Sequence, residues 1–416
     1  MKSISLASSN HLAGTPKPGM FADLACRLVL RQLQKLEHGS VRLVHGDRVL
    51  MLGQPRHEAE LHAEIRVLDS AFYADVAFGG SIGAGEAYMQ GSWQCDDLVS
   101  LVRILLRNRQ VLDEMDTGFA SLTKPLQKLF HWVNRNTRAG SRRNISAHYD
   151  LGNDFFSIWL DESMMYSAAM FERADMTLAE AQTHRLDVIC RKLDLQPTDH
   201  LLEIGTGWGG LAIHAAREFG CRVTTTTISR QQHDWAQQKV REAGLEHRIT
   251  LLQEDYRDLE GQFDKLVSIE MIEAIGAEQF NTYFEQCSSL LKPAGKLLIQ
   301  AITIADAQYD DYRKSVDFIQ RYIFPGGFLP SLSAMTASIA ESTPLLVTDV
   351  EDIGLDYART LEIWRENFFG RIDEVRALNY PESFIRMWEY YLTYCEGGFL
   401  ERAISDVHLV AEKPAW

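Results

Sequence analysis

His200–Ala216 has the sequence HLLEIGTGWGGLAIHAA, in which an apolar strand leads through a glycine-rich turn into an apolar helix. Gly205, Gly207 and Gly209 occupy alternate positions in the turn. Glycine has no Cβ, so these residues allow a sharp turn and let a ligand come close to the backbone. This order of strand, turn and helix is typical of the edge at which an α/β sheet binds its ligands.

The glycine spacing favours one kind of ligand over another. Trp208 interrupts the GxGxxG spacing of dinucleotide-binding turns, and Gly209 and Gly210 follow it directly. The acidic Glu203 precedes the turn, and an acidic residue beside a GxGxG turn is the pattern of S-adenosylmethionine (SAM)-dependent methyltransferases. We therefore predict a SAM site here. A tight turn in some other α/β protein is the alternative.

Beyond this turn, strands and helices alternate. The segments in chain order are the strand CRVTTTTIS, the helix QQHDWAQQKVREAG, the strands RITLLQEDY and FDKLVSIEM, the helix QFNTYFEQCSSLL and the strand GKLLIQAITI. Strands that are separated by helices predict a parallel sheet that is covered on both faces.

Polar residues follow the next two strands, where the ligand crevice of such a sheet lies. In dinucleotide enzymes an acidic residue after the second strand holds a ribose hydroxyl, but this chain has Thr227 and then Gln232. After the third strand, Asp255 and Tyr256 are placed to bond to an adenine or to stack on it. A polar loop explains Asp255 alone equally well.

The composition predicts a large protein with two or three domains, since the chain has 416 residues and 46% of them are apolar. A net charge of −15 argues against a general nucleic-acid binder. The six cysteines form no CxxC pair, so we expect reduced thiols in a cytoplasmic protein and no metal site. No stretch at the start of the sequence is apolar enough for a signal peptide, and no run is long enough to predict a transmembrane helix. We therefore expect the protein to meet a lipid substrate from the water side.

The domain organisation predicted from these patterns has four parts. They are a disordered tail (1–20), an N-terminal α+β domain (21–125), a basic linker (126–143) and the methyltransferase domain (144–416). Within the first domain, RLVHGDRVLML and AEIRVLDSAFYADVAF predict a β-rich unit.

The linker combines basic and bulky apolar side chains. Arg135, Arg138, Arg142 and Arg143 lie close to Leu129, Phe130, Trp132 and Val133. One interpretation is a solvated linker. The other is a strip that contacts an anionic membrane, to which each basic residue contributes about 1 kcal/mol.

Several motifs occur in one order along the chain. They are NISAHYDLGNDFFSIWLDESMMYSAAMF, LLEIGTGWG, TISRQQ, DYRDL, SIEMIEAIG, YIFPGGFLPS and DYARTLEIWRENF, with GEAYMQGSW upstream. This series resembles the cyclopropane-fatty-acyl-phospholipid synthase family, which includes the mycolic acid cyclopropane synthases. The resemblance implies a Rossmann-like, seven-stranded SAM-methyltransferase domain after a smaller α+β domain. It also implies transfer of a SAM carbon to the double bond of an unsaturated phospholipid acyl chain, at the inner face of the membrane, with a homodimer as the expected assembly.

The resemblance also implies which residues hold SAM. Tyr166 and Ser167 match the pair at the methionine end, and Tyr256 matches the residue that flanks the adenine. The full set expected at the cofactor is Tyr166, Ser167, Glu203, Gly205, Gly207, Thr227, Gln232, Asp255 and Tyr256.

In this family a bicarbonate ion is thought to serve as base or relay, so bicarbonate is the second ligand implied. Glu273, the backbone of Ile302 and Tyr357 match three of its ligands. Ala168 replaces the family's Cys and Gln300 its His, while Glu270 adds a carboxyl where bacterial members usually have Gly. The alternative interpretations are a solvated acid at a helix start for Glu273 and a core tyrosine with a satisfied hydroxyl for Tyr357.

The acyl pocket is expected along YIFPGGFLPSLSAMTASI (Tyr322–Ile339). The favoured product is a cyclopropane, and Ala168 and Gln300 leave a methyl-branched chain as the alternative. A small-molecule or head-group methyltransferase would need a polar pocket where Phe155, Phe156, Trp159 and Phe328 predict an apolar one. A non-catalytic protein that binds lipid or SAM is the remaining alternative.

Overall fold

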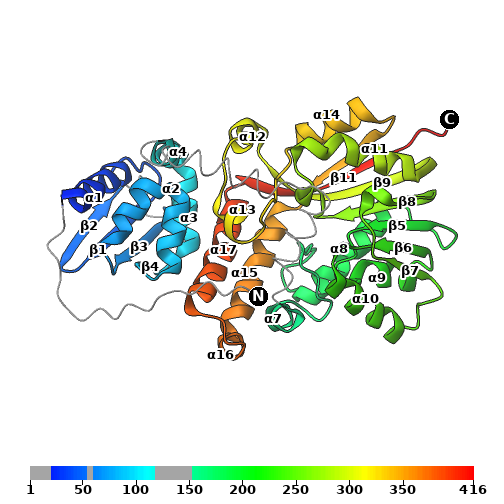
Figure 1. The fold of residues 1–416 in the computed structure, drawn as a ribbon, viewed down its shortest axis with the longest axis horizontal. Coiled ribbons are helices and arrows are strands. Elements are labelled where there is room, and N and C mark those ends of the chain that lie inside the picture. The colour runs from blue at the N-terminus through cyan, green and yellow to red at the C-terminus, as the bar shows by residue number, and fades with distance from the viewer. Residues whose placement is uncertain (1–19, 54–59, 118–151) are drawn as a thin grey trace.

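The computed structural model describes residues 20–53, 60–117 and 152–416, which form two parts packed side by side (Figure 1). The predicted tail lies outside the described residues apart from Met20, and the predicted linker, residues 126–143, lies outside them entirely. Among the helices that the structure describes, none has the length and apolar character needed to cross a bilayer.

The N-terminal part is an α+β unit, which confirms this aspect of the sequence prediction. Its elements are α1 (Met20–Leu33), β1 (Ser40–His45), β2 (Arg48–Leu52), β3 (His62–Val67), α2 (Ala71–Met89), β4 (Trp93–Cys95), α3 (Leu98–Arg107) and α4 (Arg109–Thr117). The sheet order is β2-β1-β3-β4, in which only β1 and β3 run parallel.

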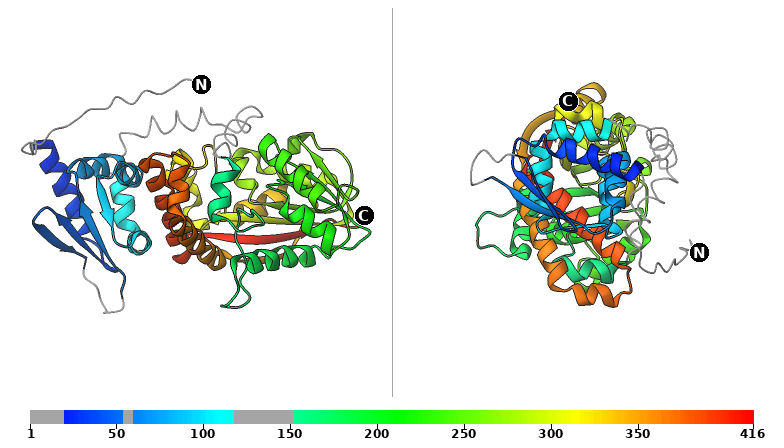
Figure 2. Two further views of the ribbon diagram at one scale, coloured as in Figure 1. Left: turned by 90° about the horizontal axis from the view of Figure 1, so that it is seen from below. Right: turned by 90° about the vertical axis from the view of Figure 1, so that its left-hand side faces the viewer.

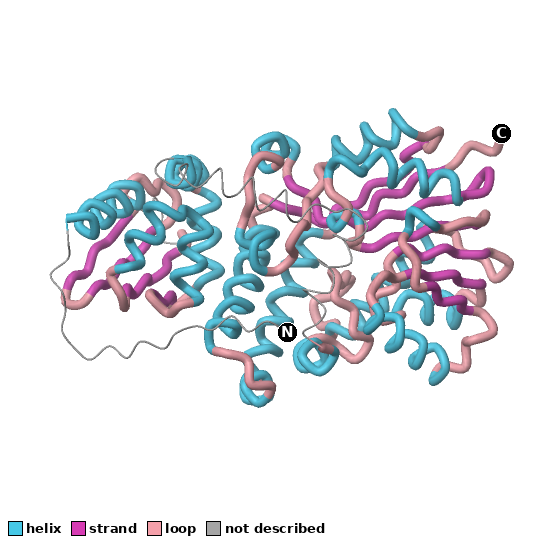
Figure 3. The backbone as a smooth tube through the Cα atoms, in the orientation of Figure 1, coloured by secondary structure: helices cyan, strands magenta, loops and turns pink. Residues whose placement is uncertain are grey.

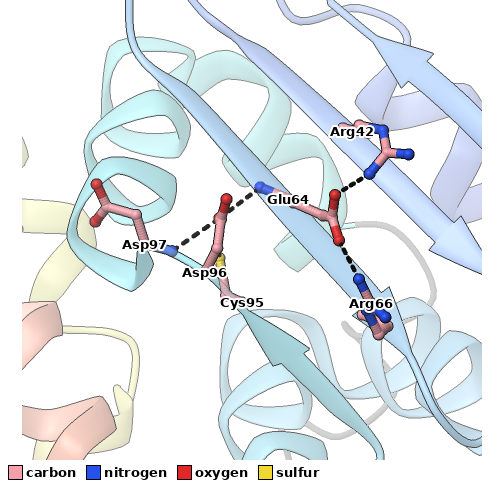
Figure 4. Close-up of polar contacts among 6 residues, drawn as sticks. All are labelled: Arg42, Glu64, Arg66, Cys95, Asp96 and Asp97. Carbon is pink, nitrogen blue, oxygen red and sulfur yellow. Dashed lines mark hydrogen bonds and ion pairs between the residues drawn. The ribbon is translucent and has the colours of Figure 1, made fainter.

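Polar contacts connect neighbouring strands of this sheet (Figure 4). Glu64 of β3 lies opposite Arg42 of β1 in the strand register, and its carboxylate bonds to Arg42 and, at 2.7 Å, to Arg66. The Asp96 carboxylate accepts hydrogen bonds from the backbone N–H groups of Glu64 (2.7 Å) and Asp97 (2.8 Å). Exposed ion pairs add little stability, so these contacts mainly align β3 with its neighbours.

The prediction of a β-rich unit was wrong for its second half, since Ala71–Met89 is the helix α2. Apolar residues occur on every side of this helix, which packs against α1 and α4 of its own part and against α17 of the C-terminal part, so no distinct polar face reveals a helical period. It kinks at Gly80, whose φ of 59° and ψ of −141° are not helical. At Gly85 an added Cβ would lie 2.5 Å from the Phe318 ring, so this glycine permits close packing between the two parts.

The C-terminal part contains a seven-stranded sheet in the order β10-β11-β9-β8-β5-β6-β7. Its elements are α7 (Asn153–Trp159), α8 (Leu178–Lys192), β5 (His200–Ile204), α9 (Gly210–Glu218), β6 (Arg222–Thr226), α10 (Arg230–Glu242), β7 (Ile249–Leu252), η2 (Tyr256–Asp258), β8 (Phe263–Ile269), η3 (Ile272–Ala274), η4 (Ala277–Gln279), α11 (Phe280–Leu290), β9 (Leu291–Ile304), α12 (Asp306–Tyr312), α13 (Phe318–Tyr322), α14 (Leu332–Ser342), β10 (Leu346–Asp352), α15 (Gly354–Gly370), α16 (Ile372–Ala377), α17 (Glu382–Leu400) and β11 (Ile404–Glu412). This confirms the expected SAM-methyltransferase fold.

Helices cover both faces of this sheet (Figures 1 and 3). Successive strand residues point to opposite faces: Leu201 packs in one core with α8, α9 and α10, whereas Leu202 packs in another with α11 and α14. The strands β9, β8, β5, β6 and β7 are parallel, while β11 is antiparallel to both of its neighbours. The residue pattern does not predict β10, which is mostly exposed, or β11, which carries Asp406 and His408 among its apolar residues.

The helix α17 joins the two parts, because it packs against α15 on one side and against α2 and α3 on the other (Figure 2). The Tyr88 hydroxyl donates to Glu389 Oε2 at 2.7 Å. Arg103 and Arg107 both bond to Glu401, at 2.7 and 2.8 Å. The N-terminal part is therefore fixed against α17 of the C-terminal part.

Candidate active site

A crevice lies where the chain order of the sheet reverses, between β5 and β8. From β5 the chain continues outward to β6 and β7, whereas β8 and β9 lie on its other side. Ligands of α/β sheets bind at the carboxyl ends of the strands at such a point. A cavity of about 1980 Å³ lies here, and residues that follow β5, β6, β7, β8 and β9 line it.

The glycine turn after β5 forms one wall of the cavity. Gly205 and Gly207 have φ angles of 103° and 53°, which favour glycine over other residues. The N–H of Gly205 donates to Thr226 O at 3.0 Å, which ties the turn to β6. A Cβ at Gly207 would meet no heavy atom within 4 Å, so the backbone faces open space there.

Glu203 lies beneath this turn and is 3% exposed. Its Oε2 accepts a hydrogen bond from Thr225 Oγ1 at 2.5 Å, and Thr225 Oγ1 also contacts Thr206 Oγ1 at 2.7 Å. Burial raises the pKa of Glu203 to about 8, although the hydrogen bond from Thr225 opposes the shift. Glu203 lines the cavity and also anchors the turn.

Residues after β6 and β7 complete the predicted cofactor wall. Thr227 Oγ1 donates to Gln232 Oε1 at 2.9 Å, so the amide nitrogen of Gln232 keeps its protons for donation. Asp255 bonds to Arg257 through both carboxylate oxygens, at 2.8 and 2.6 Å, and therefore shapes this turn. The buried hydroxyl of Tyr256 has no hydrogen-bond partner within the described part of the chain.

Tyr166 and Ser167 both line the cavity but make different contacts. The Tyr166 hydroxyl lies 2.7 Å from that of Tyr391 on α17. Ser167 Oγ donates instead to Glu270 Oε1 at 2.5 Å. Ser167 thus connects the cofactor wall to a cluster of polar groups around Glu270.

The Glu270 carboxylate is the centre of this cluster. Besides Ser167 Oγ, its Oε1 accepts from Ala168 N at 3.2 Å and from Gln300 Nε2 at 2.9 Å, and its Oε2 accepts from the Tyr357 hydroxyl at 2.9 Å. The resemblance implied that groups at Ala168, Gln300 and Tyr357 hold bicarbonate. Here these groups hold a carboxylate of the protein itself.

Glu273 and Ile302 lie beside this cluster and bond to each other. Ile302 N donates to Glu273 Oε1 at 2.6 Å. Glu273 Oε2 is buried without a partner among the described residues, and the Glu273 carbonyl accepts from Phe328 N at 2.7 Å. Burial, and then the nearby Glu270 carboxylate, raise the pKa of Glu273 to about 8.

A second polar layer, which the sequence analysis missed, supports Gln300 from below. Arg185 is fully buried, and its Nη1 donates to Gln300 Oε1 at 2.8 Å. Gln300 Nε2 also donates to Asp406 Oδ2 at 2.7 Å. Burial lowers the pKa of Arg185 and raises that of Asp406 well above its usual value. The polar residues in the otherwise apolar β11 were the available signal, but that strand was not predicted.

The expected apolar pocket is present, with two corrections to its lining. Of the expected stretch Tyr322–Ile339, only Phe324 to Leu329 lines the cavity, together with Met164 and Met165. Met335 and Ile339 of α14 pack instead in the sheet core with α11. Phe155, Phe156 and Trp159, however, are fully buried in an aromatic cluster with Trp388 and do not line it. Their size and rigidity serve the packing of α7 against α15 and α17.

Comparison with known proteins places this site in a family. The family model for mycolic acid cyclopropane synthetase matches residues 136–409. A tuberculostearic acid methyltransferase of Mycobacterium tuberculosis is 40% identical over 329 residues, covering 77% of this chain and 76% of that protein. A cyclopropane-fatty-acyl-phospholipid synthase of Escherichia coli K12 is 39% identical over 352 residues, covering 82% of this chain and 86% of that protein.

Solved structures agree with this placement. A cyclopropane synthase from Mycobacterium tuberculosis superposes with a TM-score of 0.61 at 30% identity, over 65% of this chain and 98% of that chain. A mycolic acid cyclopropane synthase complexed with S-adenosylhomocysteine (SAH) and CTAB has the same TM-score and coverage at 31% identity. This chain therefore belongs to the mycolic acid cyclopropane synthetase family and is a SAM-dependent methyltransferase.

Proposed function

We propose that this enzyme adds the methyl carbon of SAM to a cis double bond of a phospholipid acyl chain and closes a cyclopropane there. The main support is the Glu270 carboxylate, which lies in the cavity wall within a ring of hydrogen-bond donors and can accept the proton that ring closure releases. The E. coli relative is named for the same reaction, and the SAH-bound neighbour supports SAM as the donor.

The crevice at the glycine turn fits SAM. The open space at Gly207 admits a ligand against the backbone, and the buried Tyr256 hydroxyl needs a partner. Gln232 can donate to a ribose hydroxyl, and Tyr166 lies in the same cavity. When bound, SAM supplies an electrophilic methyl group on a sulfonium centre.

The residues around Glu270 then manage charge and protons. The alkene uses its π electrons to bond the new carbon, which leaves a positive charge on the acyl chain. The electrons of one C–H bond of the new carbon then form the C–C bond that closes the ring and neutralise the cation. The proton of that C–H bond passes to Glu270, so charge and atoms balance. Tyr357, Gln300 and Ser167 hold the carboxylate in place, and apolar walls keep water from the cation. Bicarbonate is not needed in this scheme.

A methyl-branched or methylene product is the second candidate, because the relative that is 40% identical is named a tuberculostearic acid methyltransferase. The two outcomes differ in the bond that the electrons of the broken C–H bond form. A C–C bond closes the ring, whereas a C=C bond gives a methylene or a methyl-branched alkene. A saturated methyl branch requires a hydride donor in addition. Incubating the protein with vesicles of a defined monounsaturated phospholipid and ¹³C-methyl SAM tests both. We expect ¹³C in a ring methylene by NMR. A labelled methyl branch or exocyclic methylene would favour the second candidate, and SAM binding without any labelled lipid would leave only a non-catalytic role.

Vesicles are also the appropriate substrate because the proposed reaction requires contact with a membrane surface. Sedimentation of the protein with anionic vesicles, compared with neutral ones, measures this contact. Arg→Glu changes within residues 126–143 test the predicted basic strip, and unchanged sedimentation of these variants would exclude it.

A further inference from the structure

The cavity of the candidate site continues into the N-terminal part. Its lining includes the glycine turn and Glu270, and also apolar residues of α2, α3 and α4. Its volume of about 1980 Å³ exceeds the roughly 300–1,000 Å³ that encloses one small ligand. The cavity therefore has room for more than the cofactor.

The N-terminal portion of this cavity is an apolar chamber. Residues that line it are Val29, Leu33, Ile65, Phe72, Val76, Ile82, Trp93, Leu101, Val102, Leu105, Leu106, Leu112 and Met115. Among its described lining residues, only Arg109 and Asp113 carry a charge, and both are substantially exposed. A chamber of this kind suits a hydrocarbon chain and not a polar ligand.

The helix α17 lies between the chamber and the catalytic cluster. Tyr391, whose hydroxyl contacts Tyr166, lines the cavity together with Tyr394, Cys395 and Phe399 of the same helix. The kink of α2 lies on the chamber wall, where Gly79 and Gly80 also line the cavity. An added Cβ at Gly79 would meet no heavy atom within 4 Å, so this residue borders open space.

We propose that this chamber binds the methyl-terminal end of the reacting acyl chain, with the double bond held near Glu270. The inference rests on the proposed function, since it concerns the rest of the same substrate. The length of chain that fits between Glu270 and the chamber then selects which double bonds react. The N-terminal part is thus a specificity-determining portion of the acyl site.

Photo-crosslinking tests the chamber without requiring turnover. Vesicles of a monounsaturated phosphatidylglycerol carry a small fraction of the same lipid with a diazirine at the methyl end of its acyl chain. We expect mass spectrometry to find the label on chamber-lining residues of the N-terminal part, between Val29 and Met115. A diazirine near the carboxyl end should label residues of the C-terminal part instead. Label from the methyl-end probe that is confined to residues 152–416 would overturn the proposal.

Substitutions that fill the chamber provide a second test. Gly79→Leu places a large side chain in the open space beside Gly79, and Gly79→Ala places a small one there. Gly370→Leu is the control, because Gly370 also has no heavy atom near an added Cβ but lies away from the cavity. Gly79→Leu should reduce labelling of the chamber-lining residues by about tenfold or more, since one methylene of mismatch in an apolar pocket changes selectivity by about 10–200-fold. Undiminished labelling would contradict the proposal, whereas absent turnover in the wild type would count against the proposed function alone.

Discussion

At the scale of single residues, the proposed chemistry depends on Glu270. It has a φ of 46°, a left-handed conformation that costs a non-glycine residue about 1–2 kcal/mol. The strain is sustained because Ser167, Ala168 and Gln300 donate to one carboxylate oxygen and Tyr357 to the other. A carboxylate so held needs no reorganisation when positive charge develops beside it.

Removing one donor should change the pH dependence of catalysis. Burial raises the pKa of Glu270, and the hydrogen bond from Tyr357 lowers it because it stabilises the ionised form. Tyr357→Phe therefore raises this pKa further, so the base ionises only at higher pH. We expect the acidic limb of the profile of kcat/KM against pH to move upward. Tyr309→Phe is the control, because Tyr309 does not line the cavity. If the acidic limb of the Tyr357→Phe profile stayed where it is in the wild type, the result would argue against Glu270 as the base.

Glu203 should make stability depend on pH. Its folded pKa of about 8 exceeds the ordinary 4.5, so the folded state holds a proton that the unfolded state has lost across this range. The free energy of unfolding should fall as pH rises through this window, by up to about 1.4 kcal/mol per pH unit from this residue. Denaturant titrations of Glu203→Gln should lack this contribution. Glu285→Gln, a change at an exposed glutamate, is the control and should retain it. If the free energy of unfolding changed equally with pH in the wild type and both variants, the pH dependence could not be assigned to Glu203.

Individual site residues could be predicted where a motif carries them. Gly205 and Gly207 follow from the turn, and Glu273 and Tyr357 from the family resemblance. The convergence of Ser167, Gln300 and Tyr357 on Glu270 could not be derived from sequence, because these three residues lie far apart along the chain and meet only in the fold. Arg185 was missed since a lone arginine on a predicted helix reads as solvent-exposed.

At the scale of elements, the parallel strands were predictable because each is a short apolar run between helices. The helix α2 was not predictable, since apolar residues occur on all of its sides and its pattern shows no helical period. The strand β11 was missed because Asp406 and His408 interrupt its apolar residues. Asp406 accepts a hydrogen bond from Gln300, and His408 Nε2 lies 3.2 Å from Gln300 Oε1. The polar residues that interrupt the strand pattern therefore support Gln300 in the candidate site.

The contact between α2 and α13 gives a test at this scale. Gly85→Ala would place a Cβ 2.5 Å from the Phe318 ring and 3.1 Å from Tyr390. Overpacking of this kind costs about 1–3 kcal/mol, so thermal unfolding should show a Tm lower by several degrees. Gly79→Ala, in the same helix but beside open space, should show no such loss. Equal Tm values for the two variants would mean that the parts do not pack as described.

At the scale of the whole molecule, the two parts share one cavity instead of forming separate compartments. The sequence predicts the order of the parts, because the motifs and the glycine turn lie in the second. It does not predict the contact between the two parts. That contact depends on the packing of α17 and on hydrogen bonds such as those of Tyr88 with Glu389 and of Arg103 with Glu401. An acyl site that spans both parts explains why the small N-terminal unit accompanies the methyltransferase domain.

The most direct test of the internal base is Glu270→Gly, assayed for lipid methylation in bicarbonate-free buffer and again after bicarbonate is added. Glycine accepts the φ of 46° without strain and leaves the ring of donors facing a space that an ion can fill. The wild type should turn over equally in both buffers, whereas the variant should be nearly inactive until bicarbonate restores it. Full activity of Glu270→Gly without bicarbonate would contradict the account.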